Sequence, residues 1–355
     1  MKSFPGGTGA MATAMAIAVL FVYTAGNAAL ARLSGHHGDA SKLSPLSKES
    51  CAVAPPGGWS GPEKWAWDRI CRGGDANFDA KLSGKGRHWW HQSWTDERVL
   101  SPSFLSTIMG NSKFAAAIPE YGIRIRGAWF KDDVTVRGTT AAAGFSLSSS
   151  RFDGKLALPG TTFSGNLGLN DLAIDGDLSL DKVSVGGDMR LNDLAVDGSV
   201  LLASLKVSGD FAVNDLKTEG SIRLADATVA GKGRINDISV DQSIDLSAAS
   251  FAELRINDIA VNRSLLLTGS RVSGRILVSD ISIDDDLLAD KLSAAVVRIS
   301  DIHVGNNMSL RQTRAPDGIR LTDSSVGAAL DVGGLDNLRM HDVSAGKTLT
   351  TASAR

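Results

Sequence analysis

Residues 167–196 read LGLNDLAIDGDLSLDKVSVGGDMRLNDLAV, a stretch whose apolar pattern repeats every eleven residues. Leu167, Leu178 and Met189 begin three successive units, and a second apolar residue follows each of them two positions later. Steps of eleven from Ile123 to Ile222 meet an apolar side chain every time. Side chains two positions apart lie on the same face of an extended strand. The pattern therefore predicts short strands whose apolar pairs point into one core.

Each unit also contains a second inward pair, such as Leu172 and Ile174, so it holds two short strands. A two-residue corner such as 170–171 separates the strands, and a three-residue corner such as 175–177 ends the unit. Because glycine adopts positive φ without steric cost, we expect left-handed backbone at the glycines in the middle of the three-residue corners. These glycines are residues 154, 165, 176, 187, 198, 209, 220, 231 and 274.

The polar residue of the two-residue corner decides the length of one coil, because Asp fills it in about every second unit. The Asp positions are 171, 193, 215, 237, 258, 280, 301, 323 and 342. This spacing of about 22 residues predicts an all-β fold, a single-stranded parallel β-helix (β-solenoid) of about ten coils over residues 122–346. Coils stacked about 4.8 Å apart would make a rod roughly 48 Å long.

The inward pairs, spaced five and six residues apart, and units such as Asn170-Asp171-Leu172 resemble the quadrilateral β-helix of pentapeptide-repeat proteins. The resemblance covers about 220 residues and implies coils with four sides. That family has a small inward residue beside each Leu, whereas this chain usually has Leu, Val or Ile there, which predicts a wider core. The regular repeat is also similar to that of bactofilins, a resemblance that implies end-to-end polymerisation.

Residues 1–31 have the layout of a secretory signal peptide: Lys2, then an apolar run over 11–23, then small residues. The run is shorter than the about 20 residues that span a bilayer comfortably. We therefore predict cleavage after Ala31 and a periplasmic or secreted protein of the bacterial envelope. The alternative is an uncleaved segment that anchors the chain in the membrane.

The segment between the signal and the repeats has two parts. Residues 32–60 are rich in Pro, Gly and Ser, which predicts a flexible linker. Residues 61–121 are Trp-rich and hold two helical patterns, one ending at Cys71 and one opened by Ser101-Pro102. We expect this region to be a small helical cap on the N-terminal end of the solenoid.

Cys51 and Cys71 are the two cysteines of the chain. Export would place them where disulfides persist, and neither lies in a CxxC motif. A redox or metal-binding thiol is the alternative, but the neighbouring residues that it needs are missing from the sequence. We therefore predict a structural disulfide between them.

The net charge of −2, with acidic and basic residues interspersed, argues against nucleic acid as a partner. The sequence contains no phosphate-binding Gly-rich loop or Ser-His-Asp arrangement, and we predict no cofactor. Carbohydrate-cleaving β-helices hold paired carboxylates in a cleft walled by long loops, whereas these coils carry almost no insertions. A polysaccharide lyase or glycoside hydrolase that uses Asp193 or Asp237 is the enzymatic alternative.

The strongest outward pattern is a column of Arg, each three residues before a corner Asp. Stacking should bring the two columns together, so we expect a ladder of salt bridges in which Arg offsets the repulsion between neighbouring Asp side chains. A groove that binds an anionic or polyhydroxylated polymer is the alternative. No metal site is predicted, because the Gly-Gly-x-Gly-x-Asp spacing of calcium-binding solenoids is missing. The candidate ligand-binding residues are Arg190, Asp193, Arg234, Asp237, Arg255 and Asp258.

All seven Trp lie between residues 59 and 129. Trp89 and Trp90, flanked by His88 and His91, are candidates for a platform that stacks on sugar rings, whereas an aromatic core of the cap is the interpretation that we favour. The two His alone are weak evidence for a metal, because no Cys or carboxylate pattern accompanies them.

Three leucines, Leu201, Leu266 and Leu288, occupy positions that should point outward. An exposed apolar strip would offer a surface to a partner, whereas a local shift of register would turn these side chains inward. One-residue deletions near Glu253 and Val296 make such a shift plausible.

These features together predict a non-enzymatic scaffold or binding protein of the cell envelope that presents a repetitive face to a protein or polysaccharide partner. Residues 347–355 form a polar tail that leaves the last coil bare. We therefore expect a homo-oligomer through the C-terminal end, or a partner docked there.

Overall fold

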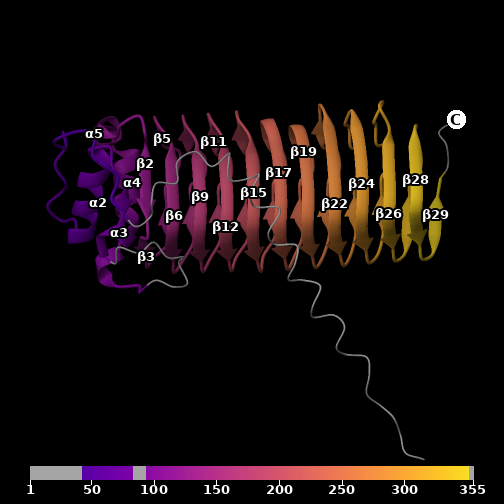
Figure 1. The fold of residues 1–355 in the computed structure, drawn as a ribbon, viewed down its shortest axis with the longest axis horizontal. Helices are drawn as coiled ribbons and strands as arrows, with labels where there is room; N and C mark the ends of the chain where they lie inside the picture. Colours follow the sequence, from indigo (N-terminus) through magenta and orange to yellow (C-terminus); the bar gives the residue numbers. More distant parts are fainter. Residues whose placement is uncertain (1–41, 83–92, 352–355) are drawn as a thin grey trace, which may run out of the picture.

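The computed structural model describes residues 42–82 and 93–351, which form a rod of stacked coils with helices gathered at its N-terminal end (Figure 1). The predicted fold is confirmed: the chain is a parallel β-solenoid of about ten turns whose equivalent residues lie about 22 positions apart. Met189, for example, pairs in parallel with Leu167 in the preceding coil and with Phe211 in the next.

Within residues 42–82 and 93–351, five short helices precede the coils. They are α2 (Gly61–Cys71), α3 (Phe78–Leu82), the 3-10 helix η2 (Asp96–Arg98), α4 (Pro102–Gly110) and α5 (Ser112–Ala117). The sequence patterns had predicted α2 and α4. A capping box between Ser60 and Glu63 begins α2, and Pro102 stands in the first turn of α4, where its missing N–H costs nothing.

The strands of the described residues form two sheets. The main sheet has 18 strands: β1 (Ala76–Asn77), β2 (Ile123–Arg126), β3 (Trp129–Phe130), β5 (Thr140–Ala141), β6 (Phe145–Phe152), β8 (Thr162–Phe163), β9 (Leu167–Ile174), β11 (Ser184–Val185), β12 (Met189–Val196), β14 (Lys206–Val207), β15 (Phe211–Thr218), β17 (Thr228–Val240), β19 (Ser250–Val261), β21 (Arg271–Val272), β22 (Arg275–Ile283), β24 (Val296–Val304), β26 (Ile319–Val326) and β28 (Leu338–Ala345). The second sheet has 11 strands: β4 (Val134–Thr135), β7 (Leu156–Ala157), β10 (Leu178–Ser179), β13 (Val200–Leu201), β16 (Ile222–Arg223), β18 (Ile244–Asp245), β20 (Leu265–Leu266), β23 (Leu287–Leu288), β25 (Met308–Ser309), β27 (Ala329–Asp331) and β29 (Thr348–Thr350).

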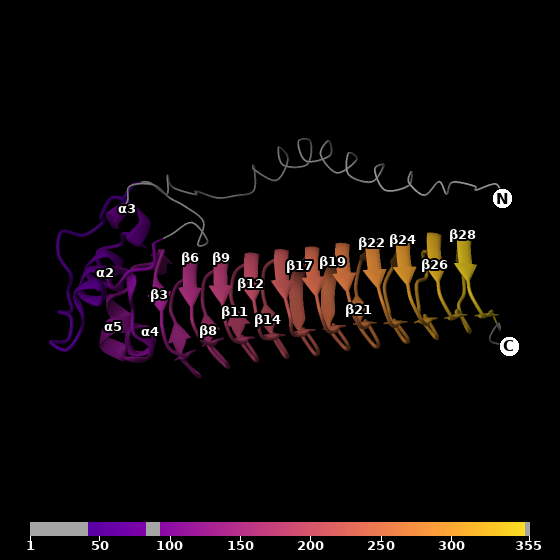
Figure 2. The same ribbon diagram turned by 90° about the horizontal axis from the view of Figure 1, so that it is seen from below.

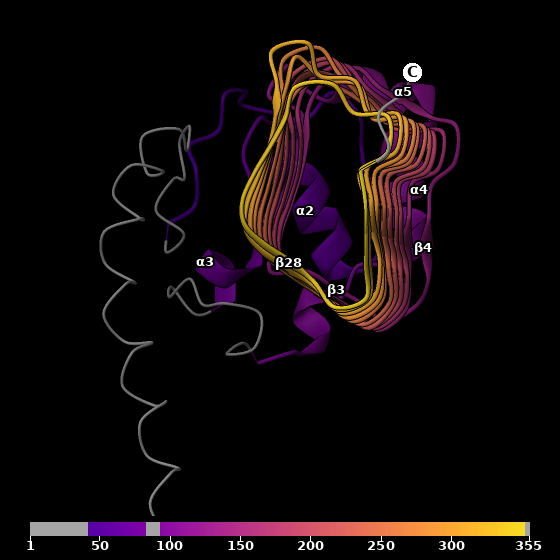
Figure 3. The ribbon, with the colours of Figure 1, turned by 90° about the vertical axis from the view of Figure 1, so that its right-hand side faces the viewer.

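The two sheets enclose one continuous core. Figure 3 looks along the rod and shows β28 and β4 on opposite sides of the coil, and Figure 2 shows the strands of the main sheet side by side along its length. The apolar columns read from the sequence face this core: Leu167, Leu178 and Met189 are each at most 1% exposed. Burial of aliphatic side chains in every coil stabilises the stack at about 25 cal/mol per Å² of apolar surface.

The left-handed residues lie in the two-residue corners, so the prediction of positive φ at the corner glycines was wrong. The φ angle is 57° at Asp171 and 56° at Asp193, whereas none of the nine predicted glycines has a positive φ. Asp tolerates this conformation because its short side chain can hydrogen-bond locally. The glycines are needed for another reason: a Cβ at Gly198 would lie 2.8 Å from the backbone N of Asp177 and 2.8 Å from the carbonyl C of Gly176 in the preceding coil.

The coils differ slightly in length. Val229 pairs with Phe251, 22 positions later, but Lys232 pairs with Glu253, only 21 positions later. The register shift lies between these two pairs, after which the strands continue in parallel. A coil can therefore lose one residue at an irregularity in the main sheet and keep its inward side chains inward.

The cap covers the first coil with both side chains and backbone. Strand β1 pairs with β2 through Ala76 and Ile125, and Val99 forms a bridge with Trp129. Aromatic rings fill the space between the helices, with Trp59 and Phe104 at a centroid distance of 5.0 Å. The cap thus pairs with β2 and β3 of the main sheet, whereas β4 of the second sheet pairs with β7 alone among the described residues.

A disulfide joins Cys51 to Cys71, whose Cα atoms lie 5.5 Å apart, and ties the segment before α2 to the end of that helix. The signal segment 1–31 and part of the predicted linker, 32–41, lie outside the described residues. Over residues 42–82 and 93–351, no helix combines the length and the hydropathy needed to cross a bilayer.

Candidate binding groove

A groove of about 710 Å³ runs across five consecutive strands of the main sheet, β15, β17, β19, β22 and β24. It lies where each strand bends at its left-handed Asp. Three residues from each strand line it: the exposed Asp, the buried Leu or Ile after it, and the exposed residue after that. The groove residues are Asp215, Asp237, Asp258, Asp280 and Asp301, with Leu216, Ile238, Ile259, Ile281 and Ile302, and with Lys217, Ser239, Ala260, Ser282 and His303.

The Asp residues of the groove repel one another. Partial burial raises the pKa of the Asp237 carboxyl, and the negative charges of Asp215 and Asp258 in the neighbouring coils raise it further. A column of interleaved Arg would have lowered this pKa instead. The groove therefore presents a row of like charges, one per coil, next to Leu and Ile residues that are at most 3% exposed.

The predicted Arg ladder differs from the observed ion pairs. Arg190 pairs with Asp188 at 2.8 Å, and Arg234 pairs with Asp210 at 3.4 Å. Both partners belong to three-residue corners, and Asp188 lies on the same face of the chain as Arg190 because it is two positions away. The expected pairing of these two Arg with the corner Asp was wrong, because the strand bends between the two columns.

Arg255 lies on a separate surface, before the bend in β19. It lines a small pocket of about 180 Å³ together with Arg234, Glu253 and Arg275. Glu253 lies 3.7 Å from Arg275, so the charges in this pocket are mixed. Of the predicted ligand-binding residues, the groove therefore brings together Asp237 and Asp258 and leaves Arg234 and Arg255 outside.

A column of Asn stands one position before the corner Asp. The Asn192 side chain donates to Asn170 at 2.7 Å, Asn214 donates to Asn192 at 2.8 Å, and Asn257 donates to Asn236 at 3.0 Å. These amides bond mainly to one another, so their role is to hold the coils in register. This leaves the Asp column, together with the exposed polar residues two positions after most of these Asp, as the polar features of the groove.

The three candidate partner-surface leucines do not form a continuous strip. Leu201 stacks between Ser179 and Arg223, whereas Leu266 stacks beside Leu288. All three side chains are half-buried, and the residues before them are buried in the core. The register is therefore not inverted here, and the apolar patch is limited to the pair of Leu266 and Leu288.

The Trp residues that the structure describes belong mainly to the cap. Trp67 is fully buried and Trp59 is 9% exposed, as expected for a capping core. Trp89 and Trp90, with His88 and His91, lie outside the described residues.

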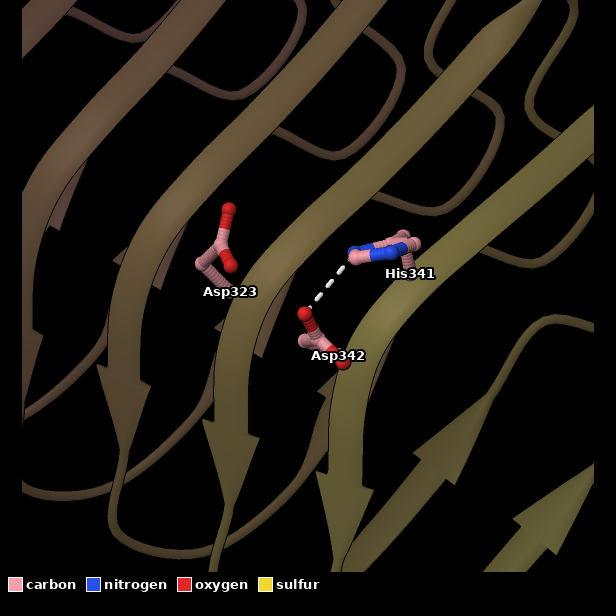
Figure 4. A group of neighbouring side chains, drawn as sticks. All are labelled: Asp323, His341 and Asp342. Carbon is pink, nitrogen blue, oxygen red and sulfur yellow. Dashed lines mark ion pairs between the residues drawn. The ribbon is translucent and has the colours of Figure 1, made fainter.

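The Asp column ends in a small cluster that the sequence reasoning missed. Asp323, His341 and Asp342 are exposed, and one ligand atom from each lies within 4.8 Å of the others. His341 Nδ1 is 2.9 Å from Asp342 Oδ2 (Figure 4). His341 stacks on Thr322 and stands where most earlier coils have Asn, Ser or Thr, so this change of residue type was the signal available in the sequence. All three side chains are open to solvent, and the imidazole already has a carboxylate partner.

The fold and the groove define a capped parallel β-solenoid with an open acidic face. Comparisons of the chain with protein-family models, with curated proteins and with solved structures found no match.

Replacement of Asp237 by Asn should raise the free energy of unfolding. Two unit charges about 4.8 Å apart repel by roughly 0.9 kcal/mol in water, and salt reduces this repulsion. Because the pKa of Asp237 is raised in the folded state, its charge costs stability above that pKa, and the cost disappears as the pH falls toward the ordinary value of 3.8. We expect a gain of up to about 1 kcal/mol at neutral pH and low salt, measured by urea unfolding.

Asp226→Asn is the matched control for this prediction. Asp226 is exposed and has a φ of 59°, but its column neighbours are Ser204 and Ala248, which carry no charge. Equal gains from the two substitutions, or a gain for Asp237→Asn that persists at low pH and in roughly 1 M salt, would contradict a repulsive Asp column.

Proposed function

We propose that this chain is a non-enzymatic scaffold of the bacterial cell envelope, periplasmic or secreted, whose groove binds an extended, positively charged partner. The observation that carries the proposal is the row of five Asp side chains along the groove, with the pKa of Asp237 raised by its neighbours. Cationic groups placed along the row would relieve this repulsion, so charge complementarity favours such a partner.

A basic protein segment fits the spacing of the coils. A polyproline II chain rises about 3.1 Å per residue, so a Lys at every third position recurs about every 9.3 Å, close to the roughly 9.6 Å of two coils. We also propose that the Asn-Asp-Leu units reflect a coil geometry shared with pentapeptide-repeat solenoids.

The test uses fluorescent peptides with four Lys-Pro-Pro or four Gln-Pro-Pro repeats. We expect the Lys peptide to bind at low salt, the Gln peptide to fail, and Asp237→Asn/Asp258→Asn/Asp280→Asn to weaken binding about tenfold or more, equivalent to at least about 1.4 kcal/mol. Asp226→Asn should leave binding unchanged. Failure of the Lys peptide to bind, or equal binding by the triple variant, would refute the proposal. Preference for a cationic polysaccharide over the peptide would point to a carbohydrate partner.

A polysaccharide lyase or hydrolase is the second candidate, and the raised pKa of Asp237 is the observation that favours it. Against it stands the exposure of the Asp column along an open groove. Release of reducing ends or unsaturated sugars from envelope polysaccharides, lost in Asp193→Asn/Asp237→Asn, would identify the enzyme. A scaffold should release neither product.

A further inference from the structure

The two ends of the rod differ in what covers them. At the N-terminal end, β1 and Val99 pair with the first coil, and Phe104, Leu105 and Ile108 of α4 are fully buried. At the C-terminal end, β28 and β29 pair only with β26 and β27, within the part of the chain that the structure describes. Each sheet therefore ends on a strand with one unpaired edge.

The open end also exposes the apolar core. Met340 is 38% exposed and Leu349 is 50% exposed. Their register partners one coil earlier, Leu321 and Leu330, are at most 1% exposed. Met340 and Leu349 thus continue the inward columns, and no described residue forms a further coil over them.

The sequence of β28 is complementary to itself about its midpoint. Leu338, Met340 and Ala345 pair with buried residues of β26 and so continue inward columns. Asp342 has a φ of 51°, and this left-handed residue shifts the in-and-out alternation of the side chains by one position. The inward side chains therefore lie at even positions before Asp342 and at odd positions after it, beginning with Val343. An antiparallel copy centred between residues 341 and 342 would therefore set apolar side chains against apolar ones and His341 against Asp342.

We propose that two copies of this chain join at their C-terminal ends across a two-fold axis. In this dimer Met340 faces Val343 of the second copy, and Leu338 faces Ala345 of the second copy. One two-fold axis can relate both sheets, because the two sheets lie on opposite sides of the coil (Figure 3). Strand β28 then pairs with β28 of the second copy, and β29 pairs with β29 of the second copy. Since the cap closes the other end, the assembly stops at two chains instead of growing into a filament.

This inference goes beyond the proposed groove function and does not depend on it. The groove residues lie in β15 to β24, whereas the contact involves β28 and β29. Loss of dimerisation should leave peptide binding by one groove intact, and the Asp variants of the groove should leave the dimer intact.

Sedimentation of the full chain tests the dimer. We expect twice the mass of one chain at micromolar concentrations, and a dissociation constant at least about a hundredfold higher for Met340→Lys/Leu349→Lys. The matched control, Leu43→Lys/Tyr121→Lys, adds the same charge at two exposed apolar residues far from β28 and should remain dimeric. Unchanged unfolding midpoints by circular dichroism would verify that each variant folds.

A single cysteine tests the symmetry. Both native cysteines are held in their disulfide, so His341→Cys places a lone thiol on each side of the axis. Mild oxidation should cross-link two chains through residue 341, whereas Thr228→Cys, exposed on the middle of the rod, should not cross-link. A monomer up to about 100 µM, a growing filament, or a dimer indifferent to Met340→Lys/Leu349→Lys would each overturn the proposal.

Discussion

Asp79→Asn should unfold the N-terminal cap while most of the solenoid stays folded. Asp79 is fully buried and accepts hydrogen bonds from Arg98 at 2.7 Å and from Arg126 at 3.0 Å. Arg98 is itself only 4% exposed, so the substitution leaves a buried guanidinium without its carboxylate. Removal of one partner from a buried ion pair costs about 3–5 kcal/mol, several times the effect of an exposed pair. The two Arg link the cap to the first coil, so the loss of stability is concentrated in the cap and its contact with that coil.

Two spectroscopic signals separate the cap from the rod. All seven Trp lie at or before residue 129, so Trp fluorescence reports the cap and the first coil, whereas far-ultraviolet circular dichroism reports mainly the strands. In urea, Asp79→Asn should lower the fluorescence midpoint and leave the dichroism midpoint nearly unchanged. Asp96→Asn is the control, because Asp96 pairs with Lys131 at the surface and is 89% exposed. A loss of under about 1 kcal/mol is expected there, and similar losses in both variants would contradict the role of the buried pair.

Gly198→Ala should destabilise the coil stack by about 1–3 kcal/mol, the cost of overpacking. The added Cβ would lie 2.8 Å from backbone atoms of both Asp177 and Gly176, and backbone cannot move aside as a flexible side chain can. The coils would have to separate locally, which would lengthen their hydrogen bonds, including the one from Gly198 N to Gly176 O at 3.2 Å. Urea unfolding followed by circular dichroism measures this loss.

Gly168→Ala is the matched control in the neighbouring long strand. A Cβ at Gly168 would meet only the side-chain ends of Asn170 and Ser146, at 3.3 Å and 3.8 Å. Removal of a strand glycine should then be neutral or stabilising by about 0.5–1 kcal/mol. If the two substitutions had the same effect, close approach of the coils would not be the reason for glycine at the corner.

The coil could be predicted from sequence because the positions of apolar residues indicate directly which side chains are buried. A column such as Leu167, Leu178 and Met189 has one physical explanation, a shared core. A glycine at a corner has two, positive φ or close approach, and the sequence does not distinguish them. The prediction of a positive φ at Gly198 was wrong for this reason. The positive φ belongs to the Asp of the two-residue corner.

The site could be predicted only in part. The Asp column was visible, because Asp237 and Asp258 recur one coil apart. The groove along this column was not visible in the sequence. Its position depends on which side of the strand is concave at the bend, and the backbone angles that decide this are not specified by the repeat. The same uncertainty caused the error over Arg190, whose partner depends on which side chains share its face.

Because the protein is a stack of similar coils, duplication or deletion of coding repeats can change its length by whole coils. Each added or deleted unit of about 22 residues would change the reach of the rod by about 4.8 Å and the groove by one Asp, with no new type of contact required. The register shift between Val229 and Lys232 indicates that the units need not be identical copies, because a missing residue is absorbed within one coil. The length of the rod can therefore change by whole coils while the helical cap at one end and the last coil at the other are retained.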